Sequence, residues 1–217
     1  MLKRRTHAGP PRSEEAMKVG MDDGAEGQTS RHVGDGRGET SARLVEAAAK
    51  EFAECGFEGT DTNKIARRAG FAPQTLYRWF EDKMAIFLVV YREWVREQLD
   101  RTDALLGRNA TNIELIDAAI AHHRAYHLFR RSLRQLALTN DRVRKARAES
   151  RLQQIERIKR WLQPIQRSTP EIAVFLLEHE RLCDAVADGE VCDLGLEDDV
   201  ASARLEQLYR ELRGQGR

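Results

Sequence analysis

Basic side chains gather in residues 60–83, and acidic residues are missing from most of that stretch. No Asp or Glu lies between Thr62 and Phe80. The basic residues there are Lys64, Arg67, Arg68 and Arg78. Because a carboxylate would repel a phosphate backbone, this pattern predicts a surface that binds nucleic acid. The whole chain has a net charge of only +1, so the attraction would come from this local surface and not from a general basic field.

Histidines and cysteines are the other residues whose spacing could do chemistry. His123 and His127 are four residues apart, and His179 and Cys183 repeat that spacing, which can hold a metal ion on a helix. No HExxH motif is present, and histidines on an apolar stripe are more often core residues. We therefore expect no metal, no cofactor and no catalytic residue. The alternative is a helical metal-dependent enzyme that uses His122 together with His123 and His127.

Composition argues against several other classes of protein. Of the 217 residues, 41% are apolar and 33% are charged, as in a well-solvated globular protein. The longest apolar run, residues 85–91, is far shorter than the roughly 20 residues of a membrane span, and no secretory signal is visible. The three cysteines form no CxxC pair, which argues against a zinc ribbon or a disulfide scaffold. We expect a cytoplasmic protein that does not enter a membrane.

From Glu39 onward nearly all of the chain has a helical period, and no segment alternates as a strand does. These patterns predict an all-α fold. A first helix should stop at Gly56, which suits the end of a helix. A short second helix should follow Thr62, which we expect to cap it, and Pro73 should open a third. A long fourth helix is predicted at about residues 83–106.

The rest of the chain predicts longer helices with few breaks. Residues 108–163 contain neither Gly nor Pro. One break is expected at residues 139–141, where side-chain hydrogen bonds compete with the helix, and a second near residues 122–128. Two further helices, at about 170–188 and 197–213, carry apolar stripes. Before all of these, residues 1–37 have no aromatic residue and no hydrophobic period, which predicts a disordered tail. A flexible arm that reaches DNA, or a true translation start at Met17 or Met21, are open interpretations of it.

Two short helices joined by a glycine-containing turn fit a helix-turn-helix at residues 61–80. Its second helix would enter the major groove with its N-terminus first. Gln74 is the best candidate for direct readout, because an amide can form two hydrogen bonds with adenine. Other side chains placed to meet base edges or thymine methyls are Pro73 and Trp79. Those placed to reach phosphate oxygens are Thr75, Tyr77 and Lys83.

The same stretch resembles the DNA-binding domain of TetR-type transcriptional regulators. The matching pieces are AA..EF.E.GF at 47–57, T.KIA..AG at 62–70 and TLY..F.DK at 75–83. The resemblance covers about residues 38–98. It implies an N-terminal three-helix DNA-binding domain there and a larger helical ligand-binding and dimerisation domain at 99–217. Carried over position by position, the DNA contacts would be Thr62, Asn63, Lys64, Pro73, Gln74, Thr75, Tyr77, Trp79 and Lys83.

Two positions depart from the family pattern. Ala72 stands where the family often has a serine cap, a loss of about 1 kcal/mol of helix stability that Pro73 partly offsets. Gln74 replaces the usual small residue before the threonine, which favours a side-chain contact over close approach of the backbone.

The resemblance further implies a ligand-responsive homodimeric repressor that binds a palindromic operator in double-stranded DNA. A DNA-binding protein without a ligand, and activation in place of repression, stay open. The dimer would form through the last two helices, with Leu176, Leu177, Leu205, Leu208 and Leu212 in a four-helix bundle. The same leucines could instead complete the core of one subunit. We expect the small-molecule effector to contact Trp94, His122, His123, Tyr126, His127, Arg130 and Trp161.

Charge is strongly segregated in the C-terminal part of the chain. Residues 124–167 contain thirteen Lys or Arg and three acidic residues, whereas residues 170–200 contain ten acidic residues and one basic residue. We favour two solvated faces that pair within the dimer, each pair contributing little. The other interpretation is an anionic ligand near Arg124, Arg130 or Arg134.

Overall fold

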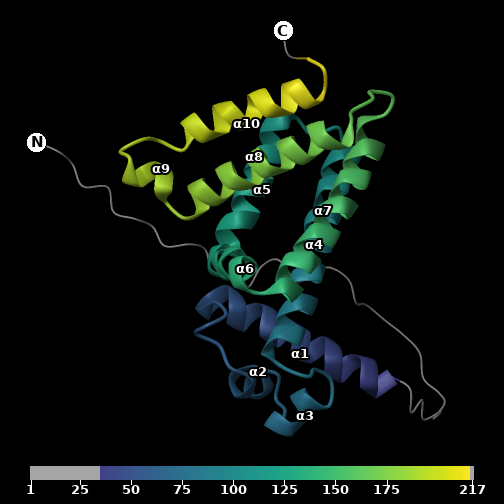
Figure 1. The fold of residues 1–217 in the computed structure, drawn as a ribbon, viewed down its shortest axis with the longest axis vertical. Coiled ribbons are helices and arrows are strands. Elements are labelled where there is room, and N and C mark those ends of the chain that lie inside the picture. Colours follow the sequence, from purple (N-terminus) through teal and green to yellow (C-terminus); the bar gives the residue numbers. More distant parts are fainter. Residues whose placement is uncertain (1–34, 216–217) are drawn as a thin grey trace, which may run out of the picture. The chain divides into compact units, whose positions relative to one another are not determined.

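The computed structural model describes residues 35–215, and these form helices without a strand (Figure 1). The helices are α1 (Asp35–Cys55), α2 (Thr62–Arg68), α3 (Pro73–Tyr77), α4 (Lys83–Gly107), α5 (Asn112–Ala125), α6 (His127–Thr139), α7 (Asp141–Leu162), α8 (Thr169–Ala187), α9 (Glu190–Asp193) and α10 (Asp199–Leu212). The prediction of an all-α fold is confirmed. The tail predicted at residues 1–37 falls mostly outside the described residues, and α1 already begins at Asp35. Within residues 35–215 no helix is both long and apolar enough to cross a membrane.

Local chemistry explains where the helices begin and end. The α1 helix stops because Gly56 takes a left-handed backbone with φ of 68°, which glycine adopts without strain. The predicted break at residues 139–141 is confirmed at Asn140, whose side chain accepts hydrogen bonds from the backbone of Arg142 and Val143 at 3.0 and 3.3 Å. The second break falls at Tyr126, between α5 and α6. The short α9 has no counterpart in the sequence predictions.

One hydrophobic core joins helices α1–α4 to α6. Its centre is a cluster of phenylalanine rings, in which Phe87 of α4 lies 5.0 Å from Phe52 and 5.0 Å from Phe129 between ring centroids. Phe57 adds a fourth ring 5.1 Å from Phe87. Because Phe129 belongs to α6, this core packs α6 directly against the N-terminal helices.

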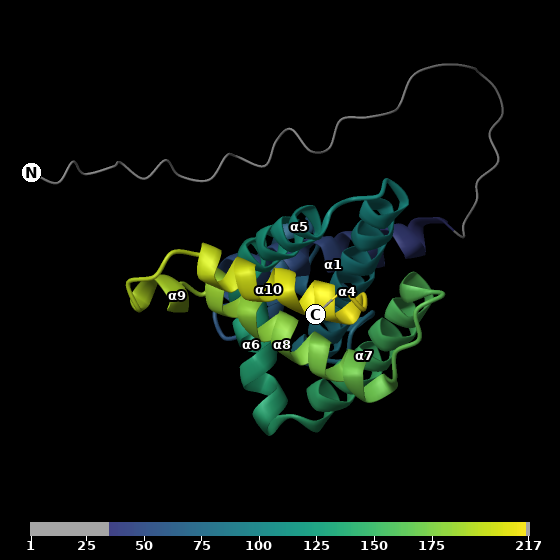
Figure 2. The same ribbon diagram turned by 90° about the horizontal axis from the view of Figure 1, so that it is seen from above.

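A second hydrophobic core lies among α5, α7, α8 and α10. Helices α8 and α10 run side by side next to α5, with α7 on the other side of α8 (Figure 2). Leu176, Leu205 and Leu208 are buried in this core, as expected if they complete the core of one subunit. Leu212 is half-buried against the same core, and Leu177 is exposed.

Gly56→Ala is expected to lower the free energy of unfolding by about 1–3 kcal/mol, because alanine is strained at positive φ. The added Cβ would also lie 3.0 Å from Ser132 Oγ. Gly107→Ala is the matched control, since a Cβ there meets nothing within 4 Å. Urea unfolding followed by circular dichroism measures both. Equal changes in the two variants would contradict the role assigned to Gly56.

Candidate functional site

The helix α2 is capped by a residue other than the predicted one. Asp61 has an extended backbone and its Oδ1 accepts a hydrogen bond from the backbone N–H of Lys64 at 2.8 Å. Thr62 is the first helical residue, and its hydroxyl is hydrogen-bonded to the hydroxyl of Tyr77 at 2.8 Å. The prediction that Thr62 caps α2 is wrong, because the carboxylate one position earlier is the stronger acceptor.

Helix α3 presents a polar and aromatic face to solvent. Pro73 opens the helix, and Ala72 forms no side-chain cap, as the sequence predicted. Leu76 and Phe80 are buried, whereas Gln74 is exposed and Tyr77 is 56% exposed. Trp79, just after the helix, is 38% exposed. Exposed large aromatics beside a free amide are groups that can meet bases and sugars in a groove.

Several predicted contact residues already have partners inside the protein. Lys64 Nζ donates to the carbonyl of Gly59 at 2.9 Å. Two other predicted contact residues differ in exposure: Thr75 is half-buried, whereas Asn63 is exposed on the first turn of α2. The bond between Thr62 and Tyr77 joins the first residue of α2 to the last residue of α3, so these two side chains fix the relative position of the two short helices.

Lys83 holds the start of α4 against the loop between α1 and α2. Its ammonium donates to the carbonyl oxygens of Phe57 and Thr60 at 2.8 and 2.9 Å. It also lies 4.0 Å from the centroid of the Phe57 ring, a favourable cation–π distance. This structural use differs from the phosphate contact predicted for Lys83.

The four basic residues of the acid-free stretch are not equivalent. Arg68 is paired with Glu51 at 2.8 Å and with Glu54 at 2.5 Å on α1, which holds α2 against α1. Arg67 and Arg78 are exposed and are the more available charges. The sequence did not single out Arg43, which donates to the carbonyl of Ala69 at 2.9 Å and packs on Phe71.

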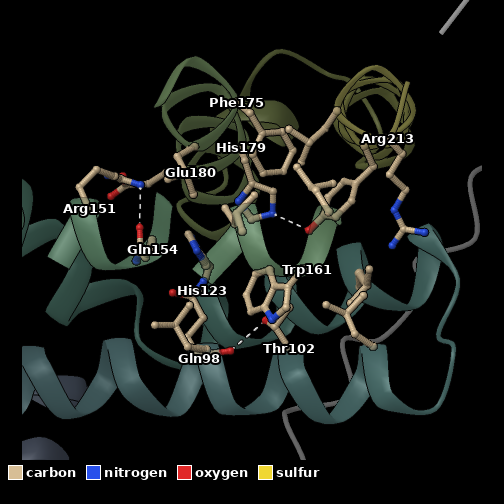
Figure 3. A pocket seen from close by; sticks show the side chains of 18 of the residues that line it. Gln98, Thr102, His123, Arg151, Gln154, Trp161, Phe175, His179, Glu180 and Arg213 are labelled. Atoms are coloured by element: carbon tan, nitrogen blue, oxygen red, sulfur yellow. Dashed lines mark hydrogen bonds and ion pairs between the residues drawn. The ribbon is translucent and has the colours of Figure 1, made fainter. Parts of the chain in front are cut away.

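A cavity of about 530 Å³ opens among α4, α5, α6, α7, α8 and α10 (Figure 3). Four of the seven residues predicted to contact a ligand line it: Trp94, His123, Arg130 and Trp161. The other three, His122, Tyr126 and His127, do not. The ring of His122 stacks on Trp94 with centroids 4.9 Å apart, and Nδ1 of His127 lies 3.1 Å from the carbonyl oxygen of Arg124.

These histidines do not form a metal site. Burial lowers the pKa of His122 to about 3, and both its ring nitrogens are buried without a hydrogen-bond partner in the described part of the chain. His123 instead turns Nδ1 to a carboxylate oxygen of Asp184 at 2.9 Å. Among residues 35–215 no three His, Cys, Asp or Glu side chains are grouped so that they could hold a metal ion.

A buried ionic cluster lies at one end of the cavity. Asp184 binds Arg130 at 2.5 Å and Arg134 at 2.6 Å, besides His123. Glu180 binds Arg130 at 2.7 Å and Arg147 at 3.2 Å; it also pairs with Arg151, and Asp188 pairs with Arg134. Burial alone would raise the pKa of Asp184, but hydrogen bonds from His123 and Arg130 outweigh it and hold the pKa well below its usual range.

Comparison with known families identifies the N-terminal helices. Residues 44–90 match the model of the bacterial regulatory proteins of the tetR family, and those residues span the end of α1, both short helices and the start of α4. The N-terminal domain is a DNA-binding domain of the TetR-family type. The exposed face of α3 lies within this matched segment.

Other proteins match the chain in sequence or in fold. YdgC of Bacillus subtilis, an HTH-type transcriptional regulator, is 34% identical over 76 residues, which are 35% of this chain and 39% of that protein. A transcriptional regulator from Saccharomonospora viridis in complex with choline has a TM-score of 0.61 and 20% identity, over 80% of this chain and 96% of that one. FadR of Bacillus subtilis in complex with stearoyl-CoA has a TM-score of 0.53 and 19% identity, over 77% and 96%. The TetR-family fold thus extends beyond residues 44–90, whereas the sequence match spans about two fifths of the curated relatives.

Residues that the sequence did not single out also line the cavity. These are Gln98, Thr102, Arg151, Gln154, Glu180 and Tyr209, among others. His179, considered only as a metal ligand, lines it too, 3.3 Å from the hydroxyl of Tyr209. The sequence did contain a signal for Arg151 and Glu180, namely the separation of basic residues in 124–167 from acidic residues in 170–200. These two segments meet at the ionic cluster.

Proposed function

We propose that the chain is a cytoplasmic, ligand-responsive TetR-family repressor that binds a palindromic operator as a homodimer. Residues 38–98 would form the DNA-binding domain and residues 99–217 the ligand-binding and dimerisation domain. The observation that carries the proposal is the combination of an exposed recognition face on α3 with a cavity of small-molecule size, since pockets of about 300–1,000 Å³ are typical of small-molecule sites.

Two copies of α3 would read successive major grooves. In a dimer of helix-turn-helix domains the recognition helices lie about 34–36 Å apart, or a multiple of that. Gln74 would contact a base, while Tyr77 and Arg78 would hold the backbone. Their exposure supports these roles, and the ring of Tyr77 stays 56% exposed although its hydroxyl is hydrogen-bonded to Thr62.

Helix α6 offers a route from the cavity to the DNA-binding helices. Arg130 and Leu133 line the cavity. On the same helix, Ser132 Oγ accepts a hydrogen bond from the backbone N–H of Phe57 at 2.9 Å. A ligand that favours a shifted α6 would therefore displace the end of α1. By linkage it would lower operator affinity to the extent that it prefers the shifted state.

The dimer would use the outer face of α8 together with α10. Val174 and Leu177 of α8 are 54% and 61% exposed, which is unusual for neighbouring large apolar side chains on one helix. The exposed face of α10 is more polar, with Gln207 and Arg210. Leu177, and not the buried Leu176, Leu205 and Leu208, is thus the leucine that supports this interface.

Ligands of related structures provide further support. Two proteins with this fold were solved in complex with stearoyl-CoA and with choline, so the fold is compatible with small-molecule ligands of very different chemistry. The metal-dependent enzyme has no such support, because the three histidines that it required point to separate partners. Whether the regulator represses or activates depends on where its operator lies relative to the promoter.

Replacing Gln74 with alanine should relax base preference at one operator position by about 1–3 kcal/mol, the discrimination of one bidentate contact. Tyr77→Ala should instead weaken binding to operator and random DNA alike, because a backbone contact carries no sequence information. Gel shifts at a fixed, stated salt concentration measure both. Gln153→Ala, exposed on α7, is the control and should bind as the parent does. Unchanged binding in both α3 variants would refute the proposed recognition face.

A further inference from the structure

We propose that the cavity binds an organic anion, with its charged head on Arg130 and Arg151 and its apolar body along the cavity between α4 and α8. The inference deepens the proposed function, on which it relies for the cavity being the effector site. The related structures do not settle the charge of the ligand, because stearoyl-CoA is an anion and choline is a cation.

The ionic cluster at the cavity carries one more positive charge than negative. Its cations are the guanidinium groups of Arg130, Arg134, Arg147 and Arg151, and its anions are the carboxylates of Glu180, Asp184 and Asp188. Four cations against three anions leave a charge of +1. The carboxylate that pairs with Arg151 is Glu180, which it shares with Arg130 and Arg147, so the charge of Arg151 is incompletely compensated.

Neighbouring histidines do not change that balance at neutral pH. Burial, with the charge of Arg130 as a further cause, lowers the pKa of His179 to about 3. Burial likewise lowers the pKa of His123 to about 4, although Asp184 opposes the shift. Both rings are neutral at pH 7. The excess charge therefore belongs to the arginines. Their side chains are at most 31% exposed, and a charge so far removed from water is costly unless a counter-ion arrives.

The arginines of the cluster that reach the cavity are Arg130 and Arg151, and Glu180 is the one carboxylate among its lining residues within 35–215. Burial, the largest cause, lowers the pKa of Arg151 to about 10, and the charges of Arg147 and Arg130 add to the shift. An anion beside Arg151 would relieve that repulsion. Arg134 and Arg147 complete the cluster behind these two and do not line the cavity.

A second observation at the same end points to a ligand acceptor. Trp94 lines the cavity and is only 5% exposed, yet its Nε1–H is buried without a hydrogen-bond partner in the described part of the chain. Arg130 lies over the same indole ring, 4.8 Å from its centroid. A buried donor normally has a partner, and a bound carboxylate or carbonyl oxygen would supply one.

The rest of the cavity suits an apolar body. Arg151, Gln154 and Glu180 gather at one side of Figure 3 and Arg213 lies at the other, with Trp161 and Phe175 between them. The aliphatic side chains that line it include Leu99, Leu106, Leu115, Ile158, Leu162 and Leu176. A cationic ligand would face the excess positive charge without a free carboxylate to bind it, so the geometry disfavours one.

The test compares ligands that differ in their head group, using the full-length protein. Decanoate, 1-decanol and decyltrimethylammonium share one alkyl chain, and naphthalene-2-acetate supplies a carboxylate on an aromatic body. Calorimetry and the fluorescence of Trp94 and Trp161 report binding without DNA. We expect at least one carboxylate to bind about ten- to hundredfold more tightly than decanol, the range of a hydrogen bond to a charged group. Decyltrimethylammonium should bind least.

Variants locate the head group. Arg151→Gln should reduce carboxylate affinity about ten- to hundredfold, and Arg151→Lys should restore part of it. The change leaves three cations facing three anions, so the fold should persist, which circular dichroism checks. Arg147→Gln is the matched control, because Arg147 lies four residues earlier on α7 and pairs with the same Glu180 but does not line the cavity. The loss of carboxylate affinity in Arg147→Gln should be markedly smaller than in Arg151→Gln.

Three results would overturn the inference: no binding of either carboxylate, equal affinity for decanoate and decanol, or a loss in Arg213→Gln in place of Arg151→Gln. Operator binding is measured separately. If a carboxylate binds with the expected pattern but leaves operator affinity unchanged, the ligand site stands and the proposed regulatory function fails. If another class of compound releases operator DNA while carboxylates do not bind, the function stands and this inference fails.

Discussion

Asp184→Asn is expected to lower the free energy of unfolding by about 3–5 kcal/mol, because it removes one partner from a buried ion pair. The carboxylate of Asp184 is 3% exposed and holds Arg130 and Arg134, of which Arg130 is 4% exposed. Asparagine keeps the shape and part of the hydrogen bonding, so the change isolates the charge. Equilibrium unfolding in urea at pH 7.5 measures the effect.

A matched surface pair tests whether burial is the cause. Glu190 binds Arg181 at 2.5 Å, with both side chains about half exposed, so Glu190→Gln should cost no more than about 1 kcal/mol. A double variant, Asp184→Leu with Arg130→Met, should recover much of the loss, since an apolar pair can replace a buried ion pair. A cost for Asp184→Asn no larger than that for Glu190→Gln would show that the cluster is not a stabilising centre.

Acid should destabilise the protein well before its carboxylates titrate. Burial lowers the pKa of His122 and His179 to about 3 and that of His123 to about 4, whereas unfolded histidine titrates near about 6.5. Below that pH these histidines are protonated in the unfolded chain but stay neutral in the folded chain. The stabilising effect is therefore complete above pH 6.5 and lost as the pH falls. Three such groups predict a loss of about 4 kcal/mol between pH 7.5 and 5.5, measured by urea unfolding at each pH.

His122→Phe separates one of these groups from the others. The phenyl ring can keep the stacking on Trp94, and His122 has no hydrogen-bond partner to lose in the described residues. The loss between pH 7.5 and 5.5 should shrink from about 4 to about 3 kcal/mol, because one fewer proton is taken up on unfolding. An unchanged pH dependence would show that His122 is not held neutral by its surroundings.

The fold was largely predictable because its boundaries are local. Gly56, Pro73 and Asn140 set helix ends through their own backbone or side-chain preferences, so their positions follow from sequence. The cap of α2 was missed by one residue, since Asp61 and Thr62 are both good caps. Asp61 has the stronger acceptor, and the hydroxyl of Thr62 is hydrogen-bonded to Tyr77 instead.

The cavity and its ionic cluster could not be predicted to the same extent. An arginine is normally taken as exposed because an unpaired buried charge is unfavourable. Arg130 is buried and Arg151 is partly buried because Glu180 and Asp184 approach from another helix, a contact between residues distant in the chain. The sequence favoured solvated pairing across a dimer, whereas the pairs form inside one subunit. Apolar stripes were equally ambiguous: Leu177 faces solvent and Leu176 the core.

The ammonium of Lys83 has a mechanical consequence. By binding two carbonyls of the loop between α1 and α2 and stacking on Phe57, it ties the first turn of α4 to that loop. A tilt of α4 would then carry this loop with it, and with the loop the start of α2. In the proposed dimer, a small rotation near the effector would become a large change in the distance between the two DNA-reading elements.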